Sequence, residues 1–422
     1  MALPQVKQDA LAARIAGLSL DAKGWAANAR ATAAERLAAQ GLPVRRDEYW
    51  RYTDPSSLTK PEVSGAAPDL APSFAALDAV KVVFTDGVFD AGASDDLAAA
   101  GIELLSQADA DIHWAQGLYG QLEARGQNPV ERPLATLNTA YAREGLLIRV
   151  TGKAAKPVSV IYNQKSASSD VILHYLVKLE AGAELTLLES GTPGARFNTV
   201  LEVDVASGAK FHHIRTQGPD AERRGVTHIF AHIADNALFK SFTLTAGGRL
   251  TRNEAILEIT GDDSVAHVAG TVMGDGKDFL QDDTIFITHA SERCESRQVY
   301  RKVLKNGATG VFQGKILVKQ GAQKTDGYQM SQSLLLDEDA QFLAKPELEI
   351  YADDVKCSHG STSGAIDETA LFYLQSRGVP KRRAQALLVL AFLAGVLEEI
   401  EDEAIAAEVQ ARLEDWLHGL TD

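Results

Sequence analysis

The sequence is poor in cysteine and lacks the motifs of the commonest enzyme chemistries. Only Cys294 and Cys357 occur in 422 residues, without a C-x-x-C pair, which excludes a disulfide framework and favours a reducing compartment. No G-x-S-x-G or H-E-x-x-H motif is present. Gly310–Lys315 is one residue too short for a phosphate-binding loop, and Ile316 replaces the hydroxyl residue that would hold Mg²⁺. The chain is therefore not predicted to be an ATPase by itself.

Long apolar runs and an excess of positive charge are also missing. The nearly apolar run Ala384–Leu397 is shorter than the roughly 20 residues that a membrane helix needs. The first 15 residues carry charges throughout, unlike the apolar core of a signal peptide. The net charge is −15, which disfavours contact with nucleic acid or an anionic membrane. We therefore predict a cytoplasmic protein with neither kind of partner.

What the sequence contains divides it into three regions. Residues 1–139 are predicted to form a mostly helical domain, with a linker rich in Pro, Ala, Ser and Gly near 61–78 and a strand within Lys81–Phe89. Residues 140–348 alternate β-branched or aromatic residues with polar ones, which predicts strands. Residues 349–422 return to helical spacing, and the run Lys381–Leu397 is apolar on nearly all sides, so we expect it to be buried in a core or against a partner.

An aromatic segment follows the first helices. Arg45–Leu58 (RRDEYWRYTDPSSL) combines three aromatic residues with many charges. We expect Trp50 and Tyr52 to pack against the helices, and contact with a partner is the alternative.

Tight polar turns recur in the strand region at a nearly constant interval. The third residues of four such turns are 26, 28 and 27 apart, and the pattern returns twice after longer intervals, at Ala183, Ala209, Ala237, Ser264, then Ala308 and Ala340. Repeats of this length indicate stacked units that bury their apolar faces on one another. The period favours a mainly β fold with a β-helix, or solenoid, core, and a sandwich of hairpins is the competitor.

A solenoid has two ends that expose unpaired strand edges. We expect the N-terminal helices to cap one end. The other end leads toward Cys357, where a second subunit could add its strands. Two copies pairing edge to edge would give a homodimer when that partner is absent.

The segment Cys357-Ser358-His359 is the strongest candidate for a site. In an extended chain, residues two apart share a face, so the thiol and the imidazole could reach one iron, zinc or iron–sulfur unit. Gly360 and Gly364 flank it on one side. Two ligands are too few for a closed site, so the rest would come from elsewhere. The alternative is a small buried cysteine beside a hydrogen-bonded histidine.

The other polar residues are expected to be structural. Adjacent histidines in strands should place one side chain inside and one outside, and Cys294 should be a solvated or half-buried thiol. Paired acids at turns are expected to be solvated corners, although they leave open a glycan lyase or hydrolase built on a solenoid. The residues concerned are His212, His213, His228, His232, His289, and the pairs Asp262-Asp263, Asp282-Asp283 and Asp353-Asp354.

Long stretches of the sequence resemble the SufB/SufD family, the scaffold subunits of the SUF iron–sulfur assembly system. They are Ala322–Leu393, which contains CSHGSTSGAIDETALFYLQSRG, then YRKVLKNGATGVFQGKILV and EYWRYTDPSSL. Within that family the chain is similar to the D-type members. Gly360 follows His359, and Met330 stands where B-type members have a cysteine, so a site completed by a partner is expected.

The resemblance implies a right-handed parallel β-helix between two helical domains, acting as a non-catalytic scaffold. It implies a complex with a SufB-like subunit and a SufC-like ABC ATPase, with His359, and with it Cys357, facing iron or a nascent cluster that is held transiently. The C-terminal helices would dock the ATPase through residues such as Phe372, Tyr373, Arg377, Leu387, Phe392 and Leu397. A homodimeric structural solenoid is the further alternative.

Overall fold

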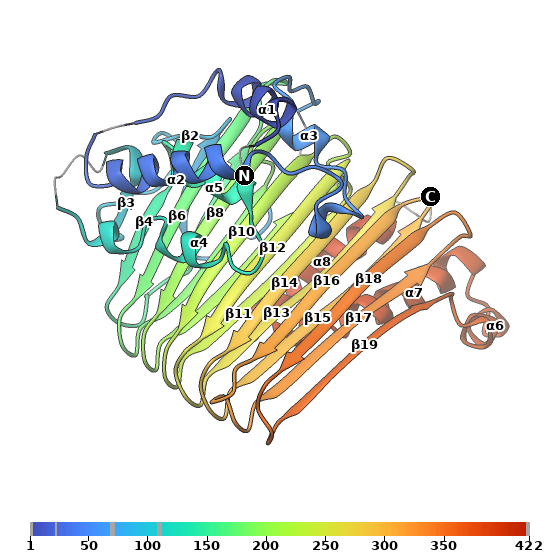
Figure 1. Ribbon diagram of the computed structural model, residues 1–422. Helices are drawn as coiled ribbons and strands as arrows, with labels where there is room; N and C mark the ends of the chain where they lie inside the picture. Colours follow the sequence, from blue (N-terminus) through green and yellow to red (C-terminus); the bar gives the residue numbers. More distant parts are fainter. Residues whose placement is uncertain (1–2, 22, 68–71, 108–111, 419–422) are drawn as a thin grey trace.

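A computed structural model describes residues 3–21, 23–67, 72–107 and 112–418. Within these ranges the chain forms a parallel solenoid of two sheets with helices packed on both outer faces (Figure 1). The predicted mainly β solenoid with flanking helices is therefore confirmed. No helix in the described ranges is both long and apolar enough to cross a membrane.

Each coil of the solenoid contributes one strand to each of the two sheets. From β5 onward, odd-numbered strands lie in sheet A and even-numbered strands in sheet B, so consecutive strands complete one coil. Sheet A contains β1 (Val80–Thr85), β2 (Val88–Phe89), β5 (Val158–Asn163), β7 (Glu184–Gly191), β9 (Lys210–Gln217), β11 (Leu238–Ala246), β13 (Val265–Asp275), β15 (Glu295–Lys305), β17 (Asp326–Leu335) and β19 (Lys356–Gly364). Sheet B contains β3 (Ile102–Leu104), β4 (Leu146–Val150), β6 (Asp170–Leu179), β8 (Arg196–Val205), β10 (Arg224–Ile233), β12 (Leu250–Ile259), β14 (Leu280–His289), β16 (Thr309–Val318) and β18 (Gln341–Ile350).

The recurring turns are the corners at which the chain passes from sheet B to sheet A. Each has one residue in the left-handed region, and the N–H of that residue donates to the corner of the next coil, as from Gly182 to the Ser207 carbonyl at 2.9 Å. The series continues through Arg293 and Lys324, with φ of 56° and 60°. The predicted continuation at Ala308 and Ala340 was wrong, because those residues lie at the opposite corners, from sheet A to sheet B. Long side chains at left-handed positions hid the true series.

The main core lies between the sheets. It is made of inward-facing apolar side chains from nearly every coil, such as Leu173, Phe211, Phe239, Ile287 and Phe312. Because parallel strands pair residue for residue, one side-chain position is repeated as a column along the solenoid. A change in one coil is therefore felt mainly in its two neighbours.

The helices cover the outer faces of the sheets. The N-terminal helices α3, α4 and α5 contact strands of sheet B, and α7 contacts β15 of sheet A. The N-terminal helices are α1 (Gln5–Ile15), α2 (Ala27–Gln40), α3 (Ser56–Thr59), α4 (Gln121–Arg125) and α5 (Pro133–Tyr141). The C-terminal helices are α6 (Glu368–Ser376), α7 (Lys381–Ala394) and α8 (Glu403–His418), and Figure 1 shows α7 and α8 behind the orange strands.

At the first end of the solenoid, each sheet finishes in a short antiparallel strand. β2 pairs antiparallel with β1, and β3 pairs antiparallel with β4. The prediction that N-terminal helices cap this end was therefore wrong in its detail, because those helices lie on the face of sheet B instead.

The C-terminal boundary also differs from the prediction at residue 349. β18 ends at Ile350, β19 continues the coil to Gly364, and helix begins only at Glu368. β19 is built of Ser, Gly and Thr around Cys357 and His359, so it lacks the apolar alternation that marks the earlier strands. Residues 68–71 of the expected linker lie outside the described residues.

Candidate functional site

The last coil leaves the far end of the solenoid open. β18 pairs with β16, β19 pairs with β17, and neither has a neighbour on its other side among the described strands (Figure 1). Each is nine or ten residues long. A long edge of this kind exposes a row of backbone donors and acceptors that can pair with another chain.

Cys357 and His359 both lie on β19, the terminal strand of sheet A. Cys357 pairs with Gly327 and His359 with Gln329, and both partners are buried residues of the inner face. His359 therefore belongs to the inner face of the last coil, yet it is exposed because no further coil covers it. The predicted junction between domains is in fact the rim of the solenoid.

The Cys357 thiol is half-buried against the preceding coil. A Cβ on Gly327 would lie 3.3 Å from its Sγ, so the sulfur fills the space left by that glycine. Burial raises the pKa of Cys357, and the nearby Asp326 carboxylate adds to this effect. The thiolate is the form that binds metal, so a metal bound by Cys357 would have to displace the thiol proton.

The described residues do not hold a complete metal site. No group of three or more His, Cys, Asp or Glu side chains is suitably placed in them. An exposed imidazole beside a protonated thiol fits transient contact with an iron or cluster that is cargo, but other ligands are needed to hold it. The donor set of the rim is thus consistent with a shared site.

Sequence reasoning missed the polar inner face next to His359. Ser331 and Ser333 of β17 face inward and hydrogen-bond with Ser361 and Ser363 of β19 at 3.1 and 2.9 Å. The available signal was the alternation of Gly327, Gln329 and Ser331 with the larger Tyr328 and Met330. The inner face of β17 and β19 is therefore polar beside His359, whereas Cys357 packs on an apolar cluster that includes Ile316 and Ala352.

A buried charge pair lies two strands behind the rim. The Lys302 ammonium donates to the Asp283 carboxylate at 2.8 Å, to the Val311 carbonyl at 2.6 Å and to Gln281. Asp282 points to the other face of β14 and pairs with Arg252. The expectation that Asp282-Asp283 is a solvated corner was wrong, because both residues lie inside a strand and are at most 1% exposed.

The remaining candidates are structural, as expected for most of them. His213 is buried and contacts Glu189 at 2.7 Å, while His212 lies on the outer face. Cys294 was expected to be solvated or half-buried, but it is 1% exposed and fills a corner beside the Gly261 carbonyl. The acids Asp262 and Asp263 do lie at an exposed corner, where both pair with Arg293. His228 and His289 are buried, His232 is partly exposed, and Asp353 and Asp354 are exposed.

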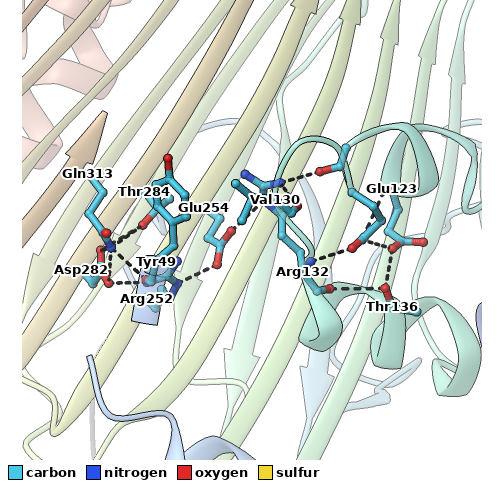
Figure 2. Close-up of polar contacts among 12 residues, drawn as sticks. Tyr49, Glu123, Val130, Arg132, Thr136, Arg252, Glu254, Asp282, Thr284 and Gln313 are labelled. Atoms are coloured by element: carbon cyan, nitrogen blue, oxygen red, sulfur yellow. Dashed lines mark hydrogen bonds and ion pairs between the residues drawn. The ribbon is translucent and has the colours of Figure 1, made fainter. Parts of the chain in front are cut away.

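The aromatic segment of the N-terminal region braces the last coils from outside. Arg252 donates to the Tyr49 carbonyl at 2.8 Å, pairs with Glu254 at 2.6 Å and lies 4.2 Å from the Trp50 ring centroid. Figure 2 shows this network of buried side chains across sheet B, with Arg132 on its other side. Packing of Trp50 against the helices is confirmed, since it lies in one cluster with Leu11 and Leu37 of α1 and α2. Tyr52 is partly buried.

Tyr49 also contacts β18, the terminal strand of sheet B. Its hydroxyl donates to Glu347 of β18 at 2.5 Å, and the Lys345 ammonium lies 4.0 Å from its ring centroid. Lys345 also pairs with Glu48 at 2.8 Å. The outer face of β18 is therefore held in place while its edge remains open.

The C-terminal helices expose an apolar surface. α6 has no buried residue, and Phe372, Tyr373 and Leu387 are 71%, 57% and 43% exposed. Arg377 is exposed as well and lies 5.2 Å from the Tyr373 ring centroid. Exposed large apolar side chains on neighbouring helices suit a protein contact site.

Two of the residues expected at that surface lie elsewhere. Leu397 is 6% exposed and packs in the core between sheet A and the C-terminal helices. Phe392 is partly buried and lies 5.3 Å from the Arg301 guanidinium. α7 is therefore buried along one face, which carries Ala384, Val389 and Leu393, while Leu387 lies on its exposed face.

Comparison with known proteins agrees with this geometry. The family model described as "SUF system FeS cluster assembly, SufBD core domain" matches residues 161–392. The iron–sulfur cluster assembly protein SufD of Escherichia coli is 31% identical over 406 residues, covering 91% of this chain and 92% of its own. A SufBD-family protein of Synechocystis is 26% identical, with 92% and 89% covered. The chloroplastic protein ABCI7 of Arabidopsis thaliana is 26% identical, with 89% and 84% covered. The chain therefore belongs to the SufB/SufD family of iron–sulfur cluster assembly proteins of the SUF system, and it is most like SufD.

Proposed function

We propose that this chain is a non-catalytic scaffold subunit of the SUF system, and that its open rim pairs with a SufB-like subunit. Membership of the family supports a role in iron–sulfur cluster assembly. The observation that carries the finer proposal is the position of His359: it is exposed on an edge strand that is paired on one side only, and the described residues around it hold no complete ligand set. Strand pairing across β18 and β19 would supply both the missing backbone partners and the missing ligands.

In this proposal the iron or nascent cluster is cargo at the contact between the subunits. His359 is the contact residue of this chain, since a neutral imidazole binds iron without losing a proton. Cys357 lies two residues away on the same face of β19, but it is half-buried against the preceding coil, whereas His359 is exposed. The cluster is shared with the partner and is not retained by this chain alone.

The exposed surface of α6 and α7 is proposed to dock a SufC-like ATPase. Phe372, Tyr373 and Leu387 offer apolar area, and Arg377 offers charge beside them. Movement of the ATPase would be passed to the solenoid through α7, which packs on β15.

The test is replacement of His359 by Ala in the complex reconstituted with both partners. We expect cluster formation to fall, while Ser358→Ala, on the other face of the same strand, should leave it unchanged. An unchanged yield from an intact His359→Ala complex would rule out the proposed site.

Four of the acids considered for a glycan lyase or hydrolase are held in ion pairs, while Asp353 and Asp354 lie exposed beside the last corner. Asp282 is paired with Arg252, Asp283 with Lys302, and both Asp262 and Asp263 with Arg293. A homodimer paired through the same rim stays compatible with the open edge, and light scattering with and without partners separates it from a strict heteromer.

A further inference from the structure

A column of polar side chains leads from the lumen to His359. Gln298 of β15 pairs with Gln329 of β17, which pairs in turn with His359 of β19. The two glutamines are 0% exposed, while His359 lies at the rim. Since neighbouring strands are about 4.8 Å apart, each side chain is within reach of the next one along the column.

The orientation of both amides follows from their hydrogen bonds. The Nε2 of Gln298 donates to the Lys315 carbonyl at 3.2 Å, so its Oε1 is the end that accepts from the Nε2 of Gln329, at 2.7 Å. A flip of either amide would set two donors or two acceptors against each other. The Oε1 of Gln329 is thus the free end of the chain of bonds.

That oxygen is buried without a donor among the described residues. Gly314 on the facing strand confines the amide, because a Cβ there would lie 2.1 Å from the Nε2 of Gln329. A buried acceptor without a donor is costly, so a group that can donate to it is expected nearby. Toward the rim, the next side chain in the column is that of His359, and its imidazole can donate an N–H.

We propose that Gln329 is a positioning residue for His359. When the imidazole turns over the opening of the lumen, its Nδ1–H donates to the Oε1 of Gln329. Nδ1 is the ring nitrogen nearer the backbone, and hence the one that reaches an adjacent strand. Nε2 then carries the lone pair and points out of the rim, where a metal can approach. This inference rests on the proposed role of His359, and it assigns the tautomer that the role requires.

The tautomer can be measured on the full-length chain without any cluster. In protein labelled with ¹⁵N-histidine at about pH 8, where imidazole is neutral, ¹⁵N chemical shifts distinguish Nδ1–H from Nε2–H, and His359→Ala identifies the signals. We expect the Nδ1–H form to predominate. Gln329→Met, which keeps the length but removes the acceptor, should move the signals toward the Nε2–H form. Ser331→Ala, on the same strand and face, should not.

Identical His359 shifts in the wild type and in Gln329→Met would overturn the proposal. If Gln329→Met does not fold, Gln298→Met serves instead, since it frees the Gln329 amide to rotate and should weaken the same bias. A second measurement separates this inference from the proposed function. In the complex with the SufB-like subunit, Gln329→Met should weaken Zn²⁺ binding by roughly 10- to 100-fold. A changed tautomer with unchanged Zn²⁺ affinity would uphold the positioning role and contradict metal contact by His359.

Discussion

Replacing Lys302 by Met should loosen the open end of the solenoid more than any part behind it. The ammonium is 0% exposed and makes three hydrogen bonds, one of them the ion pair with Asp283. Methionine fills a similar volume, but among the described residues it leaves the Asp283 carboxylate with Asn253 alone, at 3.4 Å. Removing one partner of a buried ion pair typically costs about 3–5 kcal/mol. We expect a loss of that size in the free energy of unfolding.

A matched set of variants isolates the charge. Asp283→Asn added to Lys302→Met removes the unpaired carboxylate and should recover part of the loss, so urea unfolding of the wild type, both single variants and the double variant forms a thermodynamic cycle. Hydrogen exchange then shows which strands lose stability. Because each coil contacts only its neighbours, exchange should rise in β15, β17 and β19 and stay unchanged in β7 and β9.

Two results would refute this reasoning. A Lys302→Met variant that loses less than about 1 kcal/mol would mean that Asp283 is not held as a buried charge. Equal acceleration of exchange in all coils would mean that the solenoid unfolds as one unit and that the rim has no separate stability.

Three further predictions concern the thiol, acid stability and the C-terminal surface. Cys357 should react slowly with iodoacetamide at neutral pH, since burial and Asp326 raise its pKa, and Asp326→Asn should speed the reaction; equal rates would contradict this. Burial lowers the pKa of His289 to about 4, so the unfolded state binds more protons between about pH 6.5 and 4 and stability should fall as the pH drops through that window. His289→Gln should flatten this dependence of the urea midpoint, and an unaltered slope would contradict the assignment. Phe372→Ser should weaken binding of the SufC-like ATPase without lowering the unfolding midpoint, whereas Leu397→Ala should cost about 2–5 kcal/mol of stability; the reverse pattern would overturn the surface assignment.

The solenoid could be predicted from the sequence because its corners and strands repeat. Gly182, Gly208 and Asn236 are residue types that favour the left-handed conformation, so their interval was visible in the sequence. Arg293 and Lys324 adopt the same conformation without belonging to those types. Tertiary hydrogen bonding between corners holds them there, which no local pattern reports.

The site was predicted in part. The register that brings Gln329 beside His359 depends on the pairing of β17 with β19, and sequence spacing alone does not fix it. Likewise, Asp283 and Lys302 are 19 residues apart and meet only because the lumen closes around them. The sequence placed His359 toward the far end of the solenoid, at a junction with a helical domain, but it did not show that His359 lies on the last strand.

Hydrogen exchange at the rim tests the central claim most directly. The amides of 341–350 and 356–364 are compared in this chain alone, at a concentration where light scattering gives a monomer, and in its complex with the SufB-like subunit. We predict strong new protection in both strands, together with loss of binding in Ser361→Pro, which removes an N–H and adds bulk on the edge strand. Binding that leaves both strands as unprotected as before would contradict the account.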